Sequence, residues 1–404
     1  MAAGRTAITA VAGATSMPDG SEHGAEPAPA PATPTASVST AAPGLPPLGA
    51  TLTAELQRLL DDTVADGFVP GAVLSISIPG YGPWSSASGV ADRQRDLLME
   101  PDTLVHIGSV TKMFTAVVVL QLAGEGKIDL DAPIGRYLPG IVRFADSTTV
   151  RHLLSHTSGI YDYQEDPQFI VEAYEDPEHL YEPAEMVAMA DQVGIVFRPG
   201  TRGAWRYSST NYVILGMLVE QVTGRTLAEE LHTRIFEPLG LTHTFFTPYD
   251  DLEGTPAQGY IGAADRVVLS MTFVYGTANI VSTADDLRRF TDALFGGRLI
   301  TPPSLAMMTT LGDTGGAFAM PELEYGLGVM GARMSVGPGP DGEARPDEVT
   351  AVLGHIGGIA GFRSAAWWAP ESGITIALSL NQADIDPNIL ARDVFDAILT
   401  WQGR

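Results

Sequence analysis

An apolar run from Ser109 to about Ala123 places the strongest constraint on how this chain can fold. Met113, Val117, Leu120 and their neighbours are so broadly apolar that a helix here must be buried on every side. The rest of the fold therefore has to surround this helix. Lys112 is the only charged residue in the run, although the chain of 404 residues contains only two lysines among its 23 basic residues.

Ser109 and Lys112 form an S-x-x-K pair at the start of this helix. Residues i and i+3 share a helix face, so the hydroxyl and the amine can come within hydrogen-bond distance. Burial lowers the pKa of a lysine side chain, so its neutral amine becomes available to accept a proton. An arginine guanidinium stays protonated. The pair predicts a nucleophile and its base. A serine cap followed by a solvated lysine has the same spacing, and the pair alone does not distinguish the two.

Composition excludes several classes of function. The net charge of −25 repels phosphate backbones, so we expect no binding to nucleic acid. No apolar stretch approaches the roughly 20 residues that span a bilayer, so we expect no stable membrane span. Cysteine is absent, which excludes thiol catalysis and thiolate metal sites. The motifs require no cofactor and no metal.

Residues 1–49 differ from the rest of the chain. The segment from Glu26 to Pro47 is rich in Ala and Pro and has too little apolar bulk to fold, which is typical of a linker. Upstream, Arg5 precedes a short, weakly apolar segment from Thr6 to Ala14, as in a weak secretory signal. We therefore expect a secreted or cell-envelope protein with one folded domain over residues 50–404.

The periodicity of the remaining chain predicts an α+β fold. Apolar residues at helical spacing predict an early helix that ends near Gly67, and a hairpin of two strands follows it. Residues 127–270 are mostly short helices and loops, which predicts an inserted all-α lobe. The expected strands are residues 72–78, 84–90, 325–330, 349–353, 363–369 and 374–380. The expected later helices are residues 184–190, 211–222 and 384–401. An antiparallel sheet flanked by helices, with a ligand site between sheet and lobe, is the expected architecture.

Two further segments accompany the S-x-x-K pair. Residues 205–212 read Trp-Arg-Tyr-Ser-Ser-Thr-Asn-Tyr before an apolar helix, and residues 354–358 read Gly-His-Ile-Gly-Gly in the expected sheet. The three segments resemble the S-x-x-K, Y-x-N and H-x-G motifs of the serine β-lactamase and penicillin-binding-protein superfamily. The branch is that of class C β-lactamases, D-alanyl-D-alanine carboxypeptidases, D-aminopeptidases and esterases. The resemblance runs over about residues 54–400 and includes connecting segments at 153–159, 235–241 and 282–287.

This resemblance implies an acyl-enzyme mechanism. Ser109 would attack a carbonyl, Lys112 would take the serine proton, and Tyr207, as phenol or phenolate, would shuttle a proton to the leaving group. The backbone N–H groups of Ser109 and Gly358 would form the oxyanion hole. The run of residues 160–163 looks closest to the D-alanyl-D-alanine carboxypeptidases.

The third motif would form an edge strand beside the substrate. His355 would supply polarity there, and Gly357 would let the backbone approach the substrate. Tyr207 and His355 also have purely structural interpretations. Tyr207 could be an aromatic residue of the core, and His355 could be a fully hydrogen-bonded histidine in a glycine-rich turn.

Two residues depart from the motifs of the family. Ser209 replaces the Asn of Y-x-N, and a hydroxyl there can make only one of the two hydrogen bonds that an amide makes to the lysine and to a substrate carbonyl. Ile356 replaces a hydroxyl residue that many carboxypeptidases use beside a substrate carboxylate. Ser209 and Gly357 are the expected substrate-binding residues.

We therefore expect a serine hydrolase that acts on D-alanyl peptides or related amides and esters. An esterase or acyltransferase of secondary metabolism is the first alternative, because of Ser209 and Ile356. A catalytically silent binding or sensing homologue is the second. The expected partner is a small molecule or peptide substrate, and the sequence leaves the oligomeric state open.

Overall fold

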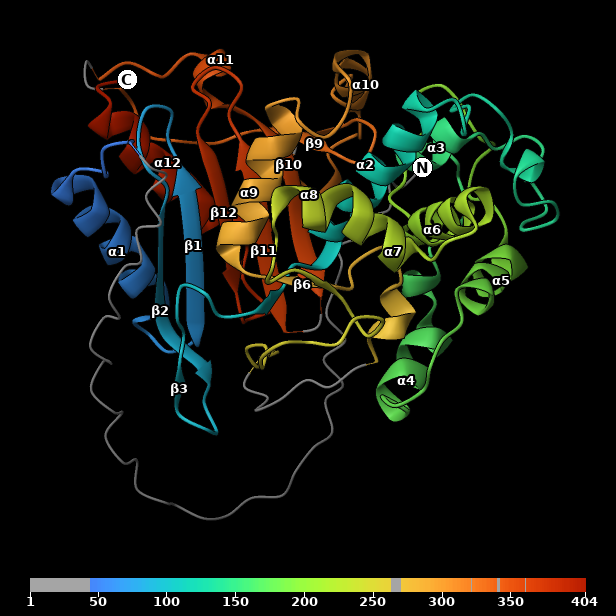
Figure 1. Ribbon diagram of the computed structural model, residues 1–404, viewed down its shortest axis with the longest axis horizontal. Helices are drawn as coiled ribbons and strands as arrows, with labels where there is room; N and C mark the ends of the chain where they lie inside the picture. Colours follow the sequence, from blue (N-terminus) through green and yellow to red (C-terminus); the bar gives the residue numbers. More distant parts are fainter. Residues whose placement is uncertain (1–43, 263–269, 321, 340–341, 360) are drawn as a thin grey trace, which may run out of the picture. The chain divides into compact units, whose positions relative to one another are not determined.

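The computed structural model of this chain describes residues 44–404 except 263–269, 321, 340–341 and 360 (Figure 1). The expected signal-like segment and nearly all of the expected linker lie outside the described residues. In the described part of the chain, no helix is long and apolar enough to cross a membrane.

A nine-stranded antiparallel sheet carries the fold, in the order β3-β2-β1-β12-β11-β10-β9-β8-β7. Its strands are β1 (Gly71–Ser77), β2 (Trp84–Asp92), β3 (Leu97–Leu98), β7 (Gly312–Asp313), β8 (Glu324–Tyr325), β9 (Met330–Arg333), β10 (Ala351–Ile359), β11 (Phe362–Trp368) and β12 (Thr375–Leu380). A second sheet has the order β4-β6-β5 and is formed by β4 (Val105–His106), β6 (Ile280–Ser282) and β5 (Phe245–Phe246).

Helices lie before, between and after these strands. The α-helices are α1 (Ala50–Val64), α2 (Thr111–Gly124), α3 (Val150–Leu154), α4 (Pro167–Glu175), α5 (Pro183–Val193), α6 (Ser209–Thr223), α7 (Leu227–Leu231), α8 (Glu237–Leu239), α9 (Ala284–Phe295), α10 (Pro302–Met308), α11 (Asp347–Thr350) and α12 (Pro387–Trp401). The shorter helical turns are η1 (Gly108–Val110), η2 (Ile134–Arg136), η3 (Tyr163–Glu165), η4 (His232–Phe236), η5 (Met271–Val274) and η6 (Ala317–Ala319).

The alternation of side chains along β1 separates the two faces of the large sheet. Leu74 and Ile76 pack into an apolar cluster with α1 and α12, the first and last helices, which lie together beside the sheet in Figure 1. Ser75 points to the opposite face, where its hydroxyl oxygen accepts a hydrogen bond from Arg288 of α9 at 3.1 Å. The sheet is thus covered by terminal helices on one face and by α9 on the other.

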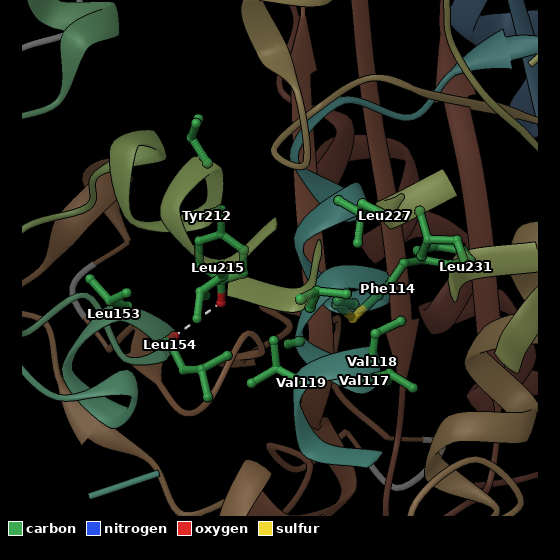
Figure 2. Packing of buried hydrophobic residues seen from close by; sticks show 14 of the residues in the cluster. Phe114, Val117, Val118, Val119, Leu153, Leu154, Tyr212, Leu215, Leu227 and Leu231 are labelled. Carbon is green, nitrogen blue, oxygen red and sulfur yellow. Dashed lines mark hydrogen bonds between the residues drawn. The ribbon is translucent and has the colours of Figure 1, made fainter. Parts of the chain in front are cut away.

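The helix expected to be buried is α2, and every residue from Thr111 to Leu120 is buried in the structure. Figure 2 shows its apolar side chains packed among α3, α6 and α7. Phe114 stacks on Phe290 of α9 with ring centroids 3.5 Å apart. The Tyr212 hydroxyl of α6 donates to the carbonyl oxygen of Leu154 at 3.0 Å, the dashed line in Figure 2. The ring stacking and the apolar packing hold α2, which carries Lys112, while the Tyr212 bond joins α6 to α3 beside it.

The expected α+β architecture is confirmed, with differences at two strands. The expected strand 325–330 is divided into β8 and β9, because Gly326 N–H donates to the Val329 carbonyl and closes a turn between them. The expected strand 349–353 begins as helix α11, and the strand itself continues to Ile359. Within the expected lobe of residues 127–270, the described residues form α3 to α8 and the short strand β5. The domain boundaries themselves stay a prediction.

We predict that Phe114→Ala destabilises the fold by about 3–5 kcal/mol, because it removes a fully buried ring from a close-packed helix. Urea denaturation followed by circular dichroism measures the loss. Leu180→Ala, at a side chain that is 69% exposed, is the matched control and should change the free energy of unfolding by less than about 0.5 kcal/mol. Equal effects of the two changes would contradict the central position of α2.

Candidate active site

The structure brings Ser109 and Lys112 together. Ser109 lies in η1, immediately before α2, and its side chain is partly exposed. Lys112 is fully buried in the first turn of α2, and its Nζ atom donates to the Ser109 hydroxyl at 3.2 Å. The S-x-x-K spacing therefore places a partly exposed hydroxyl next to a buried amine. The alternative of a serine cap followed by a solvated lysine does not fit this burial of Lys112.

Burial sets the protonation of Lys112. Its Nζ atom also donates to the Thr277 carbonyl at 3.2 Å and to Ser209 Oγ at 3.5 Å, and it lies 4.8 Å from the centroid of the Tyr207 ring. Removal from water lowers the pKa of Lys112 to about 7, while the negative charge of Asp162 opposes that shift. A substantial share of the amine is thus neutral near pH 7 and able to accept a proton.

Tyr207 also reaches this pair. It lies in the loop before α6, is partly exposed, and shares a hydrogen bond with Ser109. Burial raises the pKa of Tyr207 well above its ordinary value, and the Ser109 bond opposes this only in part, so the environment disfavours the phenolate form. The raised pKa favours the phenol form near neutral pH, and the part of Tyr207 in proton transfer stays a prediction.

His156 holds the backbone on both sides of Tyr207. The N–H of Arg206 donates to the His156 carbonyl at 3.1 Å, and the N–H of Ser208 donates to His156 Nδ1 at 3.2 Å. The imidazole ring lies 4.3 Å from the Tyr207 ring. His152, four residues earlier, uses its own ring to accept from the Thr149 N–H at the start of α3. The two histidines therefore serve different local structures.

Close backbone contacts position β10 against η1. A Cβ atom on Gly357 would lie 2.0 Å from the Ile107 carbonyl oxygen, and one on Gly108 would lie 2.7 Å from the Gly358 nitrogen. Gly108 also has a φ of +54°, a left-handed conformation that favours glycine. These contacts bring the exposed Gly358 next to Ser109. The assignment of their N–H groups to an oxyanion hole fits this placement and stays a prediction.

β10 is not the edge strand that the resemblance implies. It lies between β11 and β9 in the sheet, although its pairs with β9 in the described residues end at Gly354. His355 follows that point and is fully buried. Its Nδ1 atom donates to the Ile356 carbonyl and its Nε2 atom accepts from the Tyr325 hydroxyl at 3.0 Å. Burial lowers the pKa of His355 to about 3, so the ring stays neutral.

His355 is therefore a buried neighbour of Tyr207, with ring centroids 6.3 Å apart, and its catalytic role stays a prediction. Ile356 points to the opposite side of β10 and packs against the apolar cluster of α1 and α12. Ser209, at the start of α6, is almost fully buried, and its hydroxyl lies beside Lys112.

Two polar residues were missed as site residues. Asp162 accepts from the Ser209 N–H at 2.9 Å and from the Gln164 N–H at 3.1 Å, and burial raises its pKa. Gln164 accepts from Ser209 Oγ at 3.2 Å through its side-chain oxygen. The similarity of residues 160–163 to the carboxypeptidases pointed to this segment, but the contact to Ser209 spans 45 residues and has no sequence signature.

Several known proteins that are similar to this chain are named as hydrolases. Esterase EstB of Burkholderia gladioli is 30% identical over 292 residues, which cover 64% of this chain and 74% of EstB. The D-aminopeptidase of Brucella anthropi is 29% identical over 76% of this chain. The chain spans about half the length of several curated relatives, including 56% of this D-aminopeptidase and 53% of penicillin-binding protein 4 of Amycolatopsis lactamdurans.

Solved structures agree with these relatives. A D-stereospecific amidohydrolase from Streptomyces sp. has a TM-score of 0.72 and 33% identity, covering 85% of this chain and 97% of its own. The D-amino acid amidase from Ochrobactrum anthropi SV3, complexed with L-phenylalanine amide, has a TM-score of 0.77 and 27% identity, covering 87% and 100%. A family model described as beta-lactamase matches residues 56–398. The chain therefore belongs to the beta-lactamase family, and its relatives include an esterase, an aminopeptidase and amidases, which are hydrolases.

Proposed function

We propose that this protein cleaves D-alanyl peptides or related D-amino-acid amides and esters through an acyl-serine. The observation that carries the proposal is the 3.2 Å contact between the partly exposed Ser109 hydroxyl and the buried amine of Lys112. The D-aminopeptidase, amidohydrolase and amidase among its relatives support the choice of D-configured substrates. Location outside the cytoplasm remains a proposal that rests on residues 5–14 alone.

The geometry supports a defined sequence of steps. Neutral Lys112 accepts the Ser109 proton while the serine oxygen bonds to the substrate carbonyl carbon. The backbone N–H groups of Ser109 and Gly358 are the proposed donors to the carbonyl oxygen as it gains negative charge. Collapse of this intermediate breaks the bond to the leaving group. The proton held by Lys112 then goes to that group, with the Tyr207 phenol as the proposed relay.

Water completes the reaction. It attacks the acyl-serine carbonyl, gives a proton to the neutral Lys112, and releases the acid when Ser109 recovers that proton. Each group then returns to its starting protonation state.

An esterase or acyltransferase is the second candidate. Ile356 has no hydroxyl to offer a substrate carboxylate, and its partly buried side chain packs against the apolar cluster of α1 and α12. EstB among the relatives supports ester substrates. Products formed in the presence of a competing amine or alcohol would separate acyl transfer from hydrolysis.

We predict that Ser109→Ala lowers kcat/KM by about 10⁴-fold or more for D-alanine p-nitroanilide and for p-nitrophenyl butyrate, because the acyl-serine cannot form. Release of p-nitroaniline or p-nitrophenol measures turnover. Intact-mass spectra of the quenched wild-type protein should show one acyl group, which the variant lacks. Retained turnover in the variant would remove Ser109 as the nucleophile. If the wild-type protein turns over neither compound and forms no adduct, a binding homologue is the better description.

We predict that kcat/KM rises with pH and levels off above an apparent pKa near 7, because only neutral Lys112 can accept the serine proton. Asp162→Asn removes a negative charge that raises the pKa of Lys112, so the midpoint should move to lower pH. Lys127→Ala changes the exposed second lysine, which is paired with Glu125, and is the matched control that should leave the profile unchanged. A profile with the same midpoint in wild type and Asp162→Asn would contradict this assignment.

A further inference from the structure

A strained turn between β7 and β8 brings Phe318 against Tyr207. Phe318, in η6, has a φ of +54° and a ψ of +28°, and Ala319 after it has a φ of +57°. Residues other than glycine rarely adopt this left-handed conformation, and two in succession are costly. Backbone strain of this kind persists only where the surrounding contacts impose it.

Hydrogen bonds on both sides of Phe318 impose this conformation. The Thr314 hydroxyl accepts from the Ala317 N–H at 3.3 Å and donates to the Leu323 carbonyl at 2.6 Å. The Met320 N–H donates to the Ala317 carbonyl at 3.0 Å and closes the turn. The ring of Phe318 then meets the ring of Tyr207 edge to face, with centroids 5.2 Å apart and an angle of 85° between their planes.

Phe318 differs in exposure from most of the rings around Tyr207. The described residues whose rings contact Tyr207 are His156, Trp205, Phe318, Tyr325 and His355. Three of them are buried, whereas Trp205 and Phe318 are partly exposed. A large apolar ring that solvent reaches gains little from the core, so the strain at Phe318 is better explained by what the ring faces.

Tyr207 connects Phe318 to the reacting atoms. Its hydroxyl shares a hydrogen bond with Ser109 and is the proposed relay to the leaving group. A leaving group that takes its proton at this hydroxyl would therefore lie beside the ring of Phe318. Ile356, which is also partly buried, packs against the same apolar cluster as Phe318 and Tyr207, so this part of the site has an apolar lining.

We propose that Phe318 is a specificity-determining residue that packs against the leaving group and selects apolar, above all aromatic, leaving alcohols and amines. The inference rests on the proposed function, because it assumes an acyl-serine at Ser109 and proton delivery through Tyr207. It deepens that function by naming the leaving-group side of the substrate: aryl and alkyl esters and amides of D-amino acids. A leaving D-alanine would bring a carboxylate against these rings, which costs it hydration.

The test compares D-alanine benzyl ester with D-alanine methyl ester, which share the acyl group and release alcohols of similar acidity. The measured quantity is the ratio of their kcat/KM values, obtained from release of D-alanine. The wild-type protein should favour the benzyl ester. Phe318→Ala should lower the ratio about 3- to 10-fold, the range expected when one aromatic contact is lost.

Two further variants separate the ring from the backbone. Phe318→Gly removes the ring but tolerates the left-handed conformation, so the turn is retained and the ratio should fall as it does in Phe318→Ala. Phe318→Tyr keeps a ring and should keep the ratio. Phe68→Ala changes an exposed phenylalanine in the segment before β1 and is the matched control that should leave the ratio unchanged.

Three outcomes would overturn the inference. The first is an unchanged ratio in both Phe318→Ala and Phe318→Gly. The second is an equal loss for the two esters, which would mean that Phe318 only supports Tyr207. The third is a wild-type preference for D-alanyl-D-alanine over D-alanyl-D-alaninamide, since these differ only in the charge of the leaving group. Failure of the proposed function is seen separately, as ester turnover that survives Ser109→Ala.

Discussion

The exclusion of water from a single amine is the condition on which the rest of this site depends. Lys112 lies in a helix whose residues are buried for three turns, among apolar side chains of α3, α6 and α7. An exposed lysine keeps its proton near neutral pH and cannot act as a base, whereas this one has its pKa lowered to about 7. The large core is therefore part of the chemistry as well as the source of stability.

Around Lys112, side chains supply the hydroxyl groups and the charge of the site, and the backbone supplies the groups nearest to Ser109. Ser109 and Tyr207 are partly exposed next to the amine, while the negative charge of the buried Asp162 raises the pKa of Lys112. The glycines of η1 and β10 bring main-chain groups close to Ser109. Because glycines lie next to Ser109, main-chain groups and not side chains would face the carbonyl of a substrate.

The sequence predicted those parts of the fold and site that depend on local patterns. Helical periodicity located α2, and the three motifs located Ser109, Lys112 and Tyr207, which the structure brings together. It did not predict the division of residues 325–330 by a turn, because alternating apolar residues continue through it. The raised pKa of Tyr207 depends on burial, and the contact of Gln164 with Ser209 joins chain segments 45 residues apart, so no local pattern records either of them.

The close approach of β10 to η1 has a consequence for how this enzyme could acquire new preferences. Gly108 and Gly357 have no room for even a methyl group, so the floor of the site tolerates almost no variation. Asp162 and Gln164 contact Ser209 from a different segment of the chain, residues 160–166, in which Gln164 is partly exposed and Glu165 is exposed. Selection or engineering for altered acyl groups would therefore find its freedom in that segment, while the sheet side stays constant.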